Sequence, residues 1–470
     1  MPQSAADFST IIGEAFFWLW PLSLFLLTGV YLLVPEGWGP FAVASLLMLG
    51  LAVISLIFPV VLLYFVLLTS VLSSVLRNLD SITVGGTEVS LSGLRWIWVA
   101  AIAIVVLVIN HRQTQLRGPF FPLLLFSGWV ATRWLGSPTG VGLRDVLFYA
   151  LPAVIAVFAV LMLRTSSSRL INHIETSLLL TSAIPVIAYA IFIPAGLVKI
   201  LEGMGPEGLI DPRTTAEYLI VVLCVAVARW RYGASPGSRK VGLAIALLCL
   251  ATSMLTLSRA ATLTGLLLLG VARANVWQFR KLIAAVTLGA LFIGGSLFLF
   301  PSFRARFSVG PDAVFSEEFP YINTEGRIFF WTVTAEHAVE KPMLGWGPGS
   351  ARLLVGAAIP DSEYEEYHPH NEYLQVFHDL GLVGLLLMLL GWVPLLRVHW
   401  RRWRASDALG DNMAAQWHMS AFLALAVVLL SSAVGNTLHE TFVAAPALIL
   451  SACAFSCARS MQTYARQRSA

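Results

Sequence analysis

Apolar segments long enough to cross a lipid bilayer recur along almost the whole chain, and this repetition excludes an ordinary water-soluble fold. A transmembrane helix needs about 20 apolar residues, because the hydrocarbon core is about 30 Å thick. The candidate segments are 11–34, 41–58, 60–76, 95–110, 119–133, 146–163, 176–199, 216–229, 241–258, 260–273, 282–300, 372–396, 413–434 and 441–458. Only 12% of the residues are charged, whereas soluble domains carry about 25%. The sequence therefore predicts an all-α polytopic integral membrane protein.

The segments predict about 12 to 14 transmembrane helices within a single transmembrane domain of residues 1–470. The number depends on 41–76, where Pro59 either separates two spans or kinks one long helix. Two spans would place both chain ends on the same side of the membrane, and one would place them on opposite sides. The four cysteines lie in or beside apolar segments, so we interpret them as small buried side chains.

Basic residues indicate which connections face the cytoplasm. Lys and Arg concentrate in alternate connections, and short cytoplasmic loops carry such an excess. The long connection 301–371 falls on the opposite side, and its acidic residues outnumber its basic ones. We therefore predict that 301–371 is an external loop. Because the basic residues follow this topological pattern, the net charge of +4 gives no reason to expect a nucleic-acid partner.

The external loop contains predicted structure of its own. Residues 327–339 have an amphipathic helical pattern that ends before Lys341 and Pro342, and a Gly/Pro-rich turn follows at 345–349. Three consecutive aromatic residues in the helix indicate that it lies along the membrane surface or packs on the spans. A loop of this kind is expected to cover a site.

The stretch HPHNEYLQ ends the loop and places His368 and His370 two residues apart, with a proline between them. In extended backbone this spacing points both side chains to one side. A neutral imidazole can accept a proton from a hydroxyl nucleophile, because its pKa lies near the operating pH. Two alternatives stay open: a cluster of His and Tyr rings that anchors the chain at the membrane interface, and a zinc site, although no HExxH spacing is present.

Three arginines are candidates for binding phosphate. Arg259 interrupts an apolar stretch on the predicted outer face, where a cation is costly and an anionic partner is expected. Arg213 lies in another short external loop, and Arg327 begins the predicted helix, where it could instead pair with Glu325 or Glu336. A guanidinium binds phosphate oxygens through two parallel hydrogen bonds. The histidines and arginines together predict hydroxyl chemistry on a phosphate-bearing substrate at the membrane surface.

The order of these features resembles the O-antigen ligase and O-antigen polymerase superfamily of bacterial envelope glycosyltransferases. The resemblance covers roughly residues 250–395 and rests on LSRA, GRIFFWTVTAEHAVEKPMLGWGPGS and HPHNEYLQVFHDLGLVGLLLMLL. It implies a GT-C-like architecture in the bacterial inner membrane, with a helical periplasmic loop that carries part of the active site. It also implies transfer of a glycan from undecaprenyl diphosphate to a hydroxyl acceptor, with inversion and with neither a metal nor another cofactor.

The resemblance further implies roles for single residues. His370 matches the family's histidine before asparagine and would position or deprotonate the acceptor hydroxyl. The three arginines, Arg259 by its match and Arg213 and Arg327 by analogy, would hold the departing diphosphate and stabilise its charge. Asn371 would orient His370 or a sugar hydroxyl. His368 would have a supporting role.

The acceptor distinguishes three possible enzymes. The number of spans favours a polymerase, which joins lipid-linked repeat units of O-antigen or exopolysaccharide. An O-antigen ligase would use lipid A core, and a protein O-oligosaccharyltransferase would use a serine. A transporter of lipid-linked glycans is a different class, but the sequence has no clear internal repeat of the kind that transporters carry. The last external turn, 434–442, offers His439 and Glu440, and we interpret it as a polar hairpin tip rather than a second wall of the site.

Overall fold

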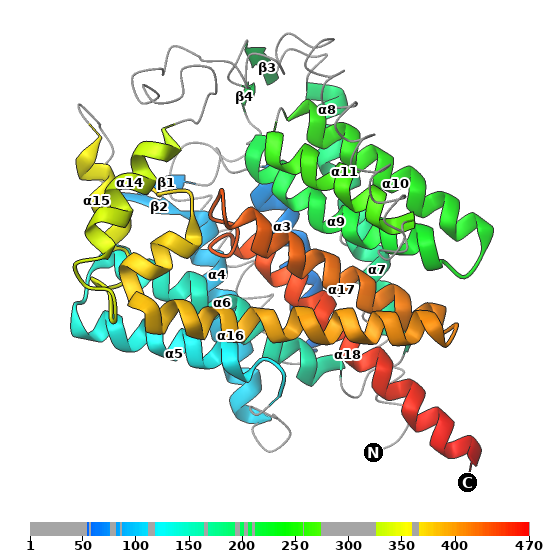
Figure 1. Ribbon diagram of the computed structural model, residues 1–470. Helices are drawn as coiled ribbons and strands as arrows, with labels where there is room; N and C mark the ends of the chain where they lie inside the picture. Colours follow the sequence, from blue (N-terminus) through cyan, green and yellow to red (C-terminus); the bar gives the residue numbers. More distant parts are fainter. Residues whose placement is uncertain are drawn as a thin grey trace.

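The computed structural model describes residues 54–55, 58–75, 81–84, 87–110, 118–163, 168–192, 198–201, 205–208, 212–256, 258–273, 326–359 and 366–469. The predicted spans 11–34 and 282–300, and most of 41–58, lie outside these residues. In Figure 1, α5, α16 and α17 run side by side across the molecule, and α14 and α15 lie at the end where α16 begins.

The predicted spans that fall within the described residues correspond to helices. They are α3 (Val60–Val75), α4 (Leu91–Ile109), α5 (Phe121–Gly136), α6 (Gly140–Leu163), α7 (Ser168–Thr181) with α8 (Ala183–Phe192), α9 (Pro212–Tyr232), α10 (Pro236–Leu255), α11 (Arg259–Arg273), α16 (Glu372–Ala408), α17 (Asn412–Ser431) and α18 (Thr441–Ser469). Within the described residues, five helical stretches are long and apolar enough to cross a membrane: Gly140–Leu163, Leu170–Ile191, Pro236–Leu255, Glu372–Ala408 and Asn412–Ser431. The predicted all-α polytopic class is confirmed.

Two short hairpins were not predicted. Strands β1 (Ser81–Val84) and β2 (Thr87–Ser90) pair antiparallel between α3 and α4. Strands β3 (Val198–Leu201) and β4 (Gly205–Gly208) pair antiparallel before α9. The predicted span 176–199 is therefore too long at its end, because the chain enters β3 there. The helical part of the same span is divided between α7 and α8.

Basic segments that were predicted to be connections continue the helices. Helix α16 extends through 397–404 to Ala408, and α18 extends through the basic tail to Ser469. Arginine is a good helix former, so a basic stretch after an apolar span does not end the helix. Helix α9 likewise continues into a basic segment that contains Arg231. Arg231 and Arg404 of α16 lie 3.4 Å and 3.6 Å from the carboxylate of Asp407, which neutralises them where the two helices meet.

Helix α9 lies at the centre of the bundle and packs against α3, α10, α11 and α17. Its apolar side chains are almost fully buried, and the four cysteines of the chain are likewise buried and free, which confirms their interpretation as small core residues. Small residues also bring helices close together. A Cβ atom at Gly391 of α16 would lie 2.5 Å from Cδ2 of Leu123 in α5, so glycine permits this close approach.

Helices α14 (Arg327–Ala338) and α15 (Ser350–Ala358) cover the end of the bundle where α16 begins. The predicted helix at 327–339 is confirmed to within one residue, and it ends before Lys341 and Pro342 as expected. Helix α15 was not predicted. Both helices pack on α16, which connects the loop segment to a membrane-spanning helix.

A break in α16 at Gly381 holds the loop segment in place. Gly381 has φ 68°, and the carbonyl oxygens of His378 and Asp379 accept hydrogen bonds from the backbone amides of Trp346 and Gly347, at 3.0 Å and 2.8 Å. A Cβ atom at Gly381 would lie 2.2 Å from the carbonyl oxygen of Met343. The turn between α14 and α15 therefore satisfies the backbone groups that the helix break leaves unpaired.

The side chain of Asp379 fixes the start of α15. Its Oδ1 accepts hydrogen bonds from the Ala351 amide at 2.7 Å and the Ser350 hydroxyl at 2.9 Å, and its Oδ2 accepts from the Gly349 amide at 2.9 Å. These donors are the unpaired groups at the helix N-terminus, where a carboxylate is favourable. The end of the loop is thereby positioned before the chain reaches His368 and His370.

Candidate functional site

The candidate site is centred on His370, at the junction of the loop, α9, α16 and the turn between α17 and α18. His370 has φ 56°, a left-handed conformation that residues other than glycine rarely adopt. The sequence had suggested extended backbone at this position, and that prediction is wrong. The rings of His368 and His370 still lie close together, with centroids 6.4 Å apart. Such strained residues concentrate at functional sites.

The Nδ1 atom of His370 contacts two donors. Nη1 of Arg213 lies 3.3 Å away, and the amide nitrogen of Asn436 lies 3.5 Å away. A guanidinium can only donate hydrogen bonds, so Nδ1 must be the acceptor and the proton of the neutral imidazole must be on Nε2. His370 therefore presents an N–H donor to any group that meets its Nε2.

The charge environment of His370 keeps the ring neutral. Burial, together with the positive charges of Arg213 and Arg327, lowers the pKa of His370 to about 2. A ring in this state can orient a hydroxyl through its Nε2–H, but it is a poor proton acceptor. A role as a general base requires that the positive charges be balanced by an anion first.

The structure brings two of the three candidate arginines to His370. Arg213 begins α9, where its Nε also donates to Glu217 at 3.1 Å. Arg327 begins α14 and is close enough to affect the pKa of His370. Arg259 begins α11, and its side chain lies outside the described residues. Short connections join α9, α10 and α11, so α9 and α11 start at the same end of the bundle. The backbone of Arg259 is therefore at the end that carries Arg213.

Asn371 and His368 have structural partners. The Oδ1 atom of Asn371 accepts a hydrogen bond from the Leu374 amide at 3.1 Å and caps α16, so this oxygen does not orient His370. Nδ1 of His368 lies 3.4 Å from Oε1 of Gln375. Burial and the charge of Arg352 lower the pKa of His368, which keeps this ring neutral. Both residues thus help to fix the segment that carries His370.

A buried network beside these residues was not predicted. Asp145 of α6 is fully buried, and its Oδ1 lies 2.8 Å from Nη1 of Arg352 in α15 and 3.0 Å from Nε2 of His439. The other side of Arg352 lies 2.6 Å from Glu366. On the far side of His439, Glu372 accepts a hydrogen bond from the Leu438 amide at 2.7 Å. The network ties α6, α15, α16 and the last turn together around the candidate site.

His439 shows that the turn at 434–442 is not simply a polar tip. The side chains of Asn436 and His439 are buried, so the turn forms a wall of the site, contrary to our interpretation from the sequence. Burial by itself lowers the pKa of His439. The carboxylates of Asp145 and Glu372 have the larger opposite effect, so the pKa is raised to about 9. The imidazole is therefore charged and balances these acids. The acidic Asp145 at the start of an apolar span was the signal that could have revealed the network.

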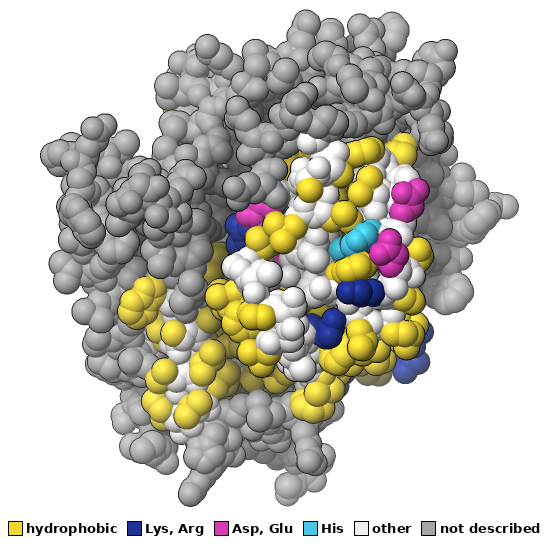
Figure 2. All heavy atoms as spheres, turned by 90° about the vertical axis from the view of Figure 1, so that its left-hand side faces the viewer, with side chains coloured by type: hydrophobic (Ala, Val, Ile, Leu, Met, Phe, Trp, Pro, Cys, Tyr) yellow, Lys and Arg dark blue, Asp and Glu magenta, His cyan; other side chains and the backbone are white. Residues whose placement is uncertain are grey.

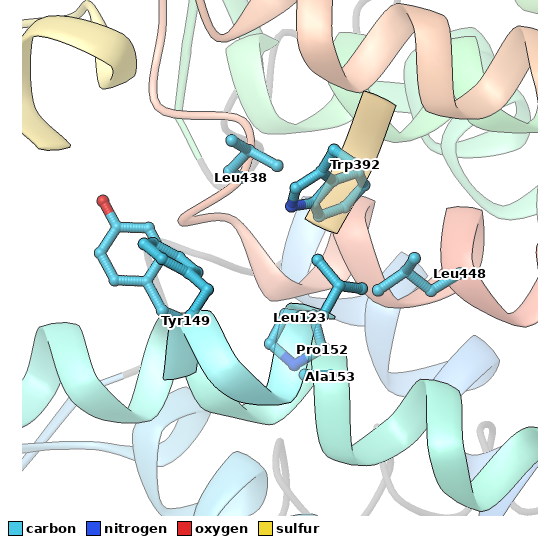
Figure 3. Close-up of a pocket in the computed structure, with 8 residues that line it drawn as sticks. Leu123, Tyr149, Pro152, Ala153, Trp392, Leu438 and Leu448 are labelled. Carbon is cyan, nitrogen blue, oxygen red and sulfur yellow. The ribbon is translucent and has the colours of Figure 1, made fainter. Parts of the chain in front are cut away.

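An apolar cavity near this network is not the site. Leu123, Tyr149, Trp392, Leu438 and Leu448 are among the side chains that line it, and its interior holds no more than about one water molecule. In Figure 3 the Tyr149 hydroxyl points away from Trp392 and Leu448. The cavity is therefore a packing defect among α5, α6, α16 and α18, too small for a sugar.

The end of the molecule that carries α14 and α15 is mixed in character. Figure 2 shows hydrophobic side chains on this face, with charged side chains and a histidine among them. The turn after α14 contributes exposed Val339, Met343 and Leu344 next to the charged Glu340 and Lys341. Such a mixture is typical of surfaces at a membrane interface. It agrees with the predicted position of the loop segment at the membrane surface.

Comparisons with known proteins bear on the same part of the chain. The sequence profile of the O-antigen ligase family matches residues 244–389. A candidate polysaccharide ligase of Rickettsia conorii is 37% identical over 73 residues, which cover 13% of this chain and 17% of the relative. A candidate polysaccharide ligase of Rickettsia felis is 34% identical over the same length, with the same shares. The chain thus spans 17% of the length of the curated relatives it matches.

The matched region contains α11, α14, α15 and the first part of α16, and with them Arg259, Arg327 and His370. Arg213, Asp145 and His439 lie outside it, and the fold brings them to the same place. The resemblance predicted from the sequence is confirmed for this region, because residues 244–389 match the model of the O-antigen ligase family.

Proposed function

We propose that the protein is a membrane glycosyltransferase that moves a glycan from undecaprenyl diphosphate to a hydroxyl acceptor. The observation that carries the proposal is the contact between His370 and Arg213, at 3.3 Å, beside the start of α14 with Arg327. A neutral imidazole next to guanidinium groups suits a reaction in which a hydroxyl attacks and an anionic diphosphate leaves. The family match over residues 244–389 supports the same class of reaction.

In the proposed reaction the acceptor oxygen attacks the anomeric carbon of the glycan, on the face opposite the diphosphate. The bond between that carbon and the diphosphate oxygen breaks, and its electron pair leaves with the diphosphate. Arg213 and Arg327, with Arg259, stabilise this charge. When Arg213 turns to the diphosphate, Nδ1 of His370 loses its charged donor and keeps only the longer, 3.5 Å contact with the amide nitrogen of Asn436. The imidazole then has a basic nitrogen and can take the proton of the acceptor hydroxyl.

The identity of the acceptor separates the enzymes of this class. The family and the Rickettsia relatives are described as ligases, which favours transfer of an assembled polysaccharide to lipid A core or another hydroxyl. The polymerase predicted from the number of spans stays a prediction, because several of those spans lie outside the described residues. Transfer to a protein serine is a third possibility, and the assay described below includes it.

We also propose that the protein lies in the bacterial inner membrane with the site at the periplasmic face. The distribution of basic residues supports this orientation. Helices α14 and α15 pack where α16 begins, whereas Arg404 lies near the other end of α16, where Asp407 also meets Arg231 of α9. The loop 301–371 would then supply part of the active site from the periplasm. Residues 1–470 would form one transmembrane domain.

A reconstituted assay tests the proposal. Purified protein in liposomes receives undecaprenyl-diphosphate-linked repeat units alone, with lipid A core, or with a serine-containing acceptor protein, and the products are separated on gels. Wild-type protein should transfer the glycan in one arm, and His370→Ala should abolish the product while remaining in the membrane. Glu336→Gln, an exposed change on α14, is the control. Donor that crosses between leaflets without chemical change would instead show a transporter.

A further inference from the structure

The turn between α17 and α18 presents polar atoms without partners beside His370. Asn436 is only 4% exposed, its amide nitrogen lies 3.5 Å from Nδ1 of His370, and its Oδ1 has no hydrogen-bond partner among the described residues. Thr437 is 1% exposed, and its hydroxyl also lacks a partner in the described part of the chain. Buried polar groups in native proteins are nearly always hydrogen-bonded, so unpaired ones next to a reactive histidine point to a ligand.

The same turn is in contact with Arg213 through Gly435. A Cβ atom at Gly435 would lie 3.3 Å from Nη2 of Arg213 and 3.2 Å from the carbonyl oxygen of Ser431. Both contacts are tighter than is usual, so glycine lets the turn approach the guanidinium. Asn436 therefore follows directly after the position where the turn meets the arginine that contacts His370.

The turn is held rigidly. The Glu372 amide donates to the Ser432 carbonyl at 2.8 Å, and the Glu372 side chain accepts from the Leu438 amide at 2.7 Å. His439 completes the anchorage through its 3.0 Å contact with Asp145. A polar group on such a turn is preorganised, so binding a ligand through it costs little conformational entropy.

The unpaired Oδ1 atom of Asn436 cannot have the diphosphate as its partner. Its Oδ1 can only accept a hydrogen bond, and phosphate oxygens at neutral pH are acceptors as well. A sugar hydroxyl can donate to Oδ1 and, at the same time, accept from another group. The hydroxyl of Thr437 can likewise either donate to or accept from a sugar. The pair of residues therefore suits a polyhydroxylated carbohydrate.

We propose that Asn436 binds the acceptor sugar, through a hydroxyl next to the one that His370 engages, and that Thr437 assists it. The inference rests on the proposed glycosyltransferase function. It assigns the turn at 435–437 to acceptor recognition, and the arginines to the donor. Substitutions in the turn should therefore change the dependence of the rate on the acceptor and leave its dependence on the donor unchanged.

The test measures initial rates with the full-length protein in liposomes. The acceptor is a methyl glycoside of the repeat unit, varied at fixed undecaprenyl-diphosphate-linked donor, and then the donor is varied. Asn436→Leu keeps a similar volume and removes the polar atoms. It should raise the KM for the acceptor about tenfold, as expected for the loss of a buried hydrogen bond. Thr437→Val should have a smaller effect in the same direction, and Leu430→Ala, at an exposed position of α17 outside the turn, should have none.

Thermal unfolding separates binding from a structural role. Because Oδ1 of Asn436 has no partner within the described residues, and its amide nitrogen makes only the long, 3.5 Å contact with His370 among them, Asn436→Leu should leave the Tm unchanged or raise it. A lower Tm with a general loss of activity would overturn the inference in favour of a structural role. A raised Tm with unchanged KM would mean that the polar atoms bind only ordered water, which also overturns it. A raised KM for the donor alone would contradict the assignment to the acceptor.

The assay distinguishes failure of this inference from failure of the proposed function. If wild-type protein transfers glycan, His370→Ala does not, and Asn436→Leu behaves as wild type, only the inference is wrong. If wild-type protein transfers no glycan to any acceptor, the proposed function is wrong, and the inference falls with it.

Discussion

The guanidinium of Arg213 lies 3.3 Å from Nδ1 of His370, so one arginine touches the histidine and is also a candidate ligand of the diphosphate. The N–H group of Arg213 that donates to His370 cannot donate to the diphosphate at the same time. In the absence of substrate it holds His370 neutral with the proton on Nε2. An anion that attracts the guanidinium would therefore also change the state of the imidazole. In the proposed function, binding of the donor and activation of His370 are therefore coupled through this contact.

Replacing Arg213 by Ala should raise the pKa of His370 from about 2. The change removes a positive charge, but the pKa should stay below 6.5 because burial is the larger cause of the shift. The measurement is an NMR titration of the His370 ring proton, assigned by comparison with His370→Asn. Adding inorganic pyrophosphate to the wild-type protein should shift the pKa in the same direction.

Arg144→Ala is the control for this titration, since Arg144 is half-exposed and pairs with Glu366 rather than with His370. Its effect on the pKa of His370 should be within error. A His370 pKa that stays near 2 in Arg213→Ala would contradict the coupling, whatever the activity of that variant.

The buried ion pair between Asp145 and Arg352 should be essential for stability. Their atoms lie 2.8 Å apart, and the side chains are 0% and 6% exposed. Arg352→Met leaves a buried carboxylate with less compensation, which should cost about 3–5 kcal/mol of unfolding free energy. Arg144→Met removes an exposed partner of Glu366 and should cost less than about 1 kcal/mol. Equal losses of Tm in detergent for the two variants would show that the buried network does not stabilise the fold.

His439 should make the stability of the protein fall at alkaline pH. The pKa of His439 is about 9 in the folded protein and about 6.5 in the unfolded protein. Its contribution to the free energy of unfolding is therefore complete below pH 6.5 and is lost as the pH rises through 9. The expected loss is of the order of 3 kcal/mol. The measurement compares the Tm of wild type and His439→Gln between about pH 6 and pH 10. The difference between the two proteins should shrink across this range, and a constant difference would rule out a charged His439.

The helix break at Gly381 should be necessary for docking of the loop segment. Gly381→Ala introduces a Cβ atom at a positive φ, 2.2 Å from the Met343 carbonyl oxygen, so α14 and α15 should detach or shift. Limited proteolysis should then cleave within 326–371 faster, and glycan transfer should fall. Gly128→Ala in α5 is the control, because a Cβ atom added there would meet no other atom within 4 Å. If Gly381→Ala resists the protease as well as the wild-type protein does, this role of the helix break is contradicted.

Patterns that depend on local sequence were readable before the structure. The long apolar runs predicted α6, α16 and α17, because only burial in lipid or protein explains so many consecutive apolar residues. The amphipathic spacing and the proline at 342 predicted α14 almost to the residue. The helices that continued through basic segments were missed, because arginine marks a membrane side without ending a helix.

The candidate site was readable only in part. His370 and Arg213 were both chosen as polar residues at the same predicted face, but their contact joins positions 157 residues apart, which no local pattern specifies. Asp145 was missed because it sits at the edge of an apolar run and its partner Arg352 is far away in sequence. Asn371 was assigned to the site through the family resemblance, whereas an asparagine directly before a helix is favoured as its cap.

The proposed orientation predicts which residues an impermeant reagent can reach in whole cells. The four natural cysteines are buried, so a membrane-impermeant maleimide should give a low background with the wild-type protein. Lys341→Cys, in the exposed turn between α14 and α15, should be labelled from the periplasm once the outer membrane is permeabilised. Ser235→Cys, exposed between α9 and α10, should be labelled only after the inner membrane is also opened, because its basic neighbours favour the cytoplasm. Both positions lie on the surface, so neither substitution should unfold the protein. The opposite labelling order would place His370 and its arginines on the cytoplasmic face, where a periplasmic acceptor could not reach them.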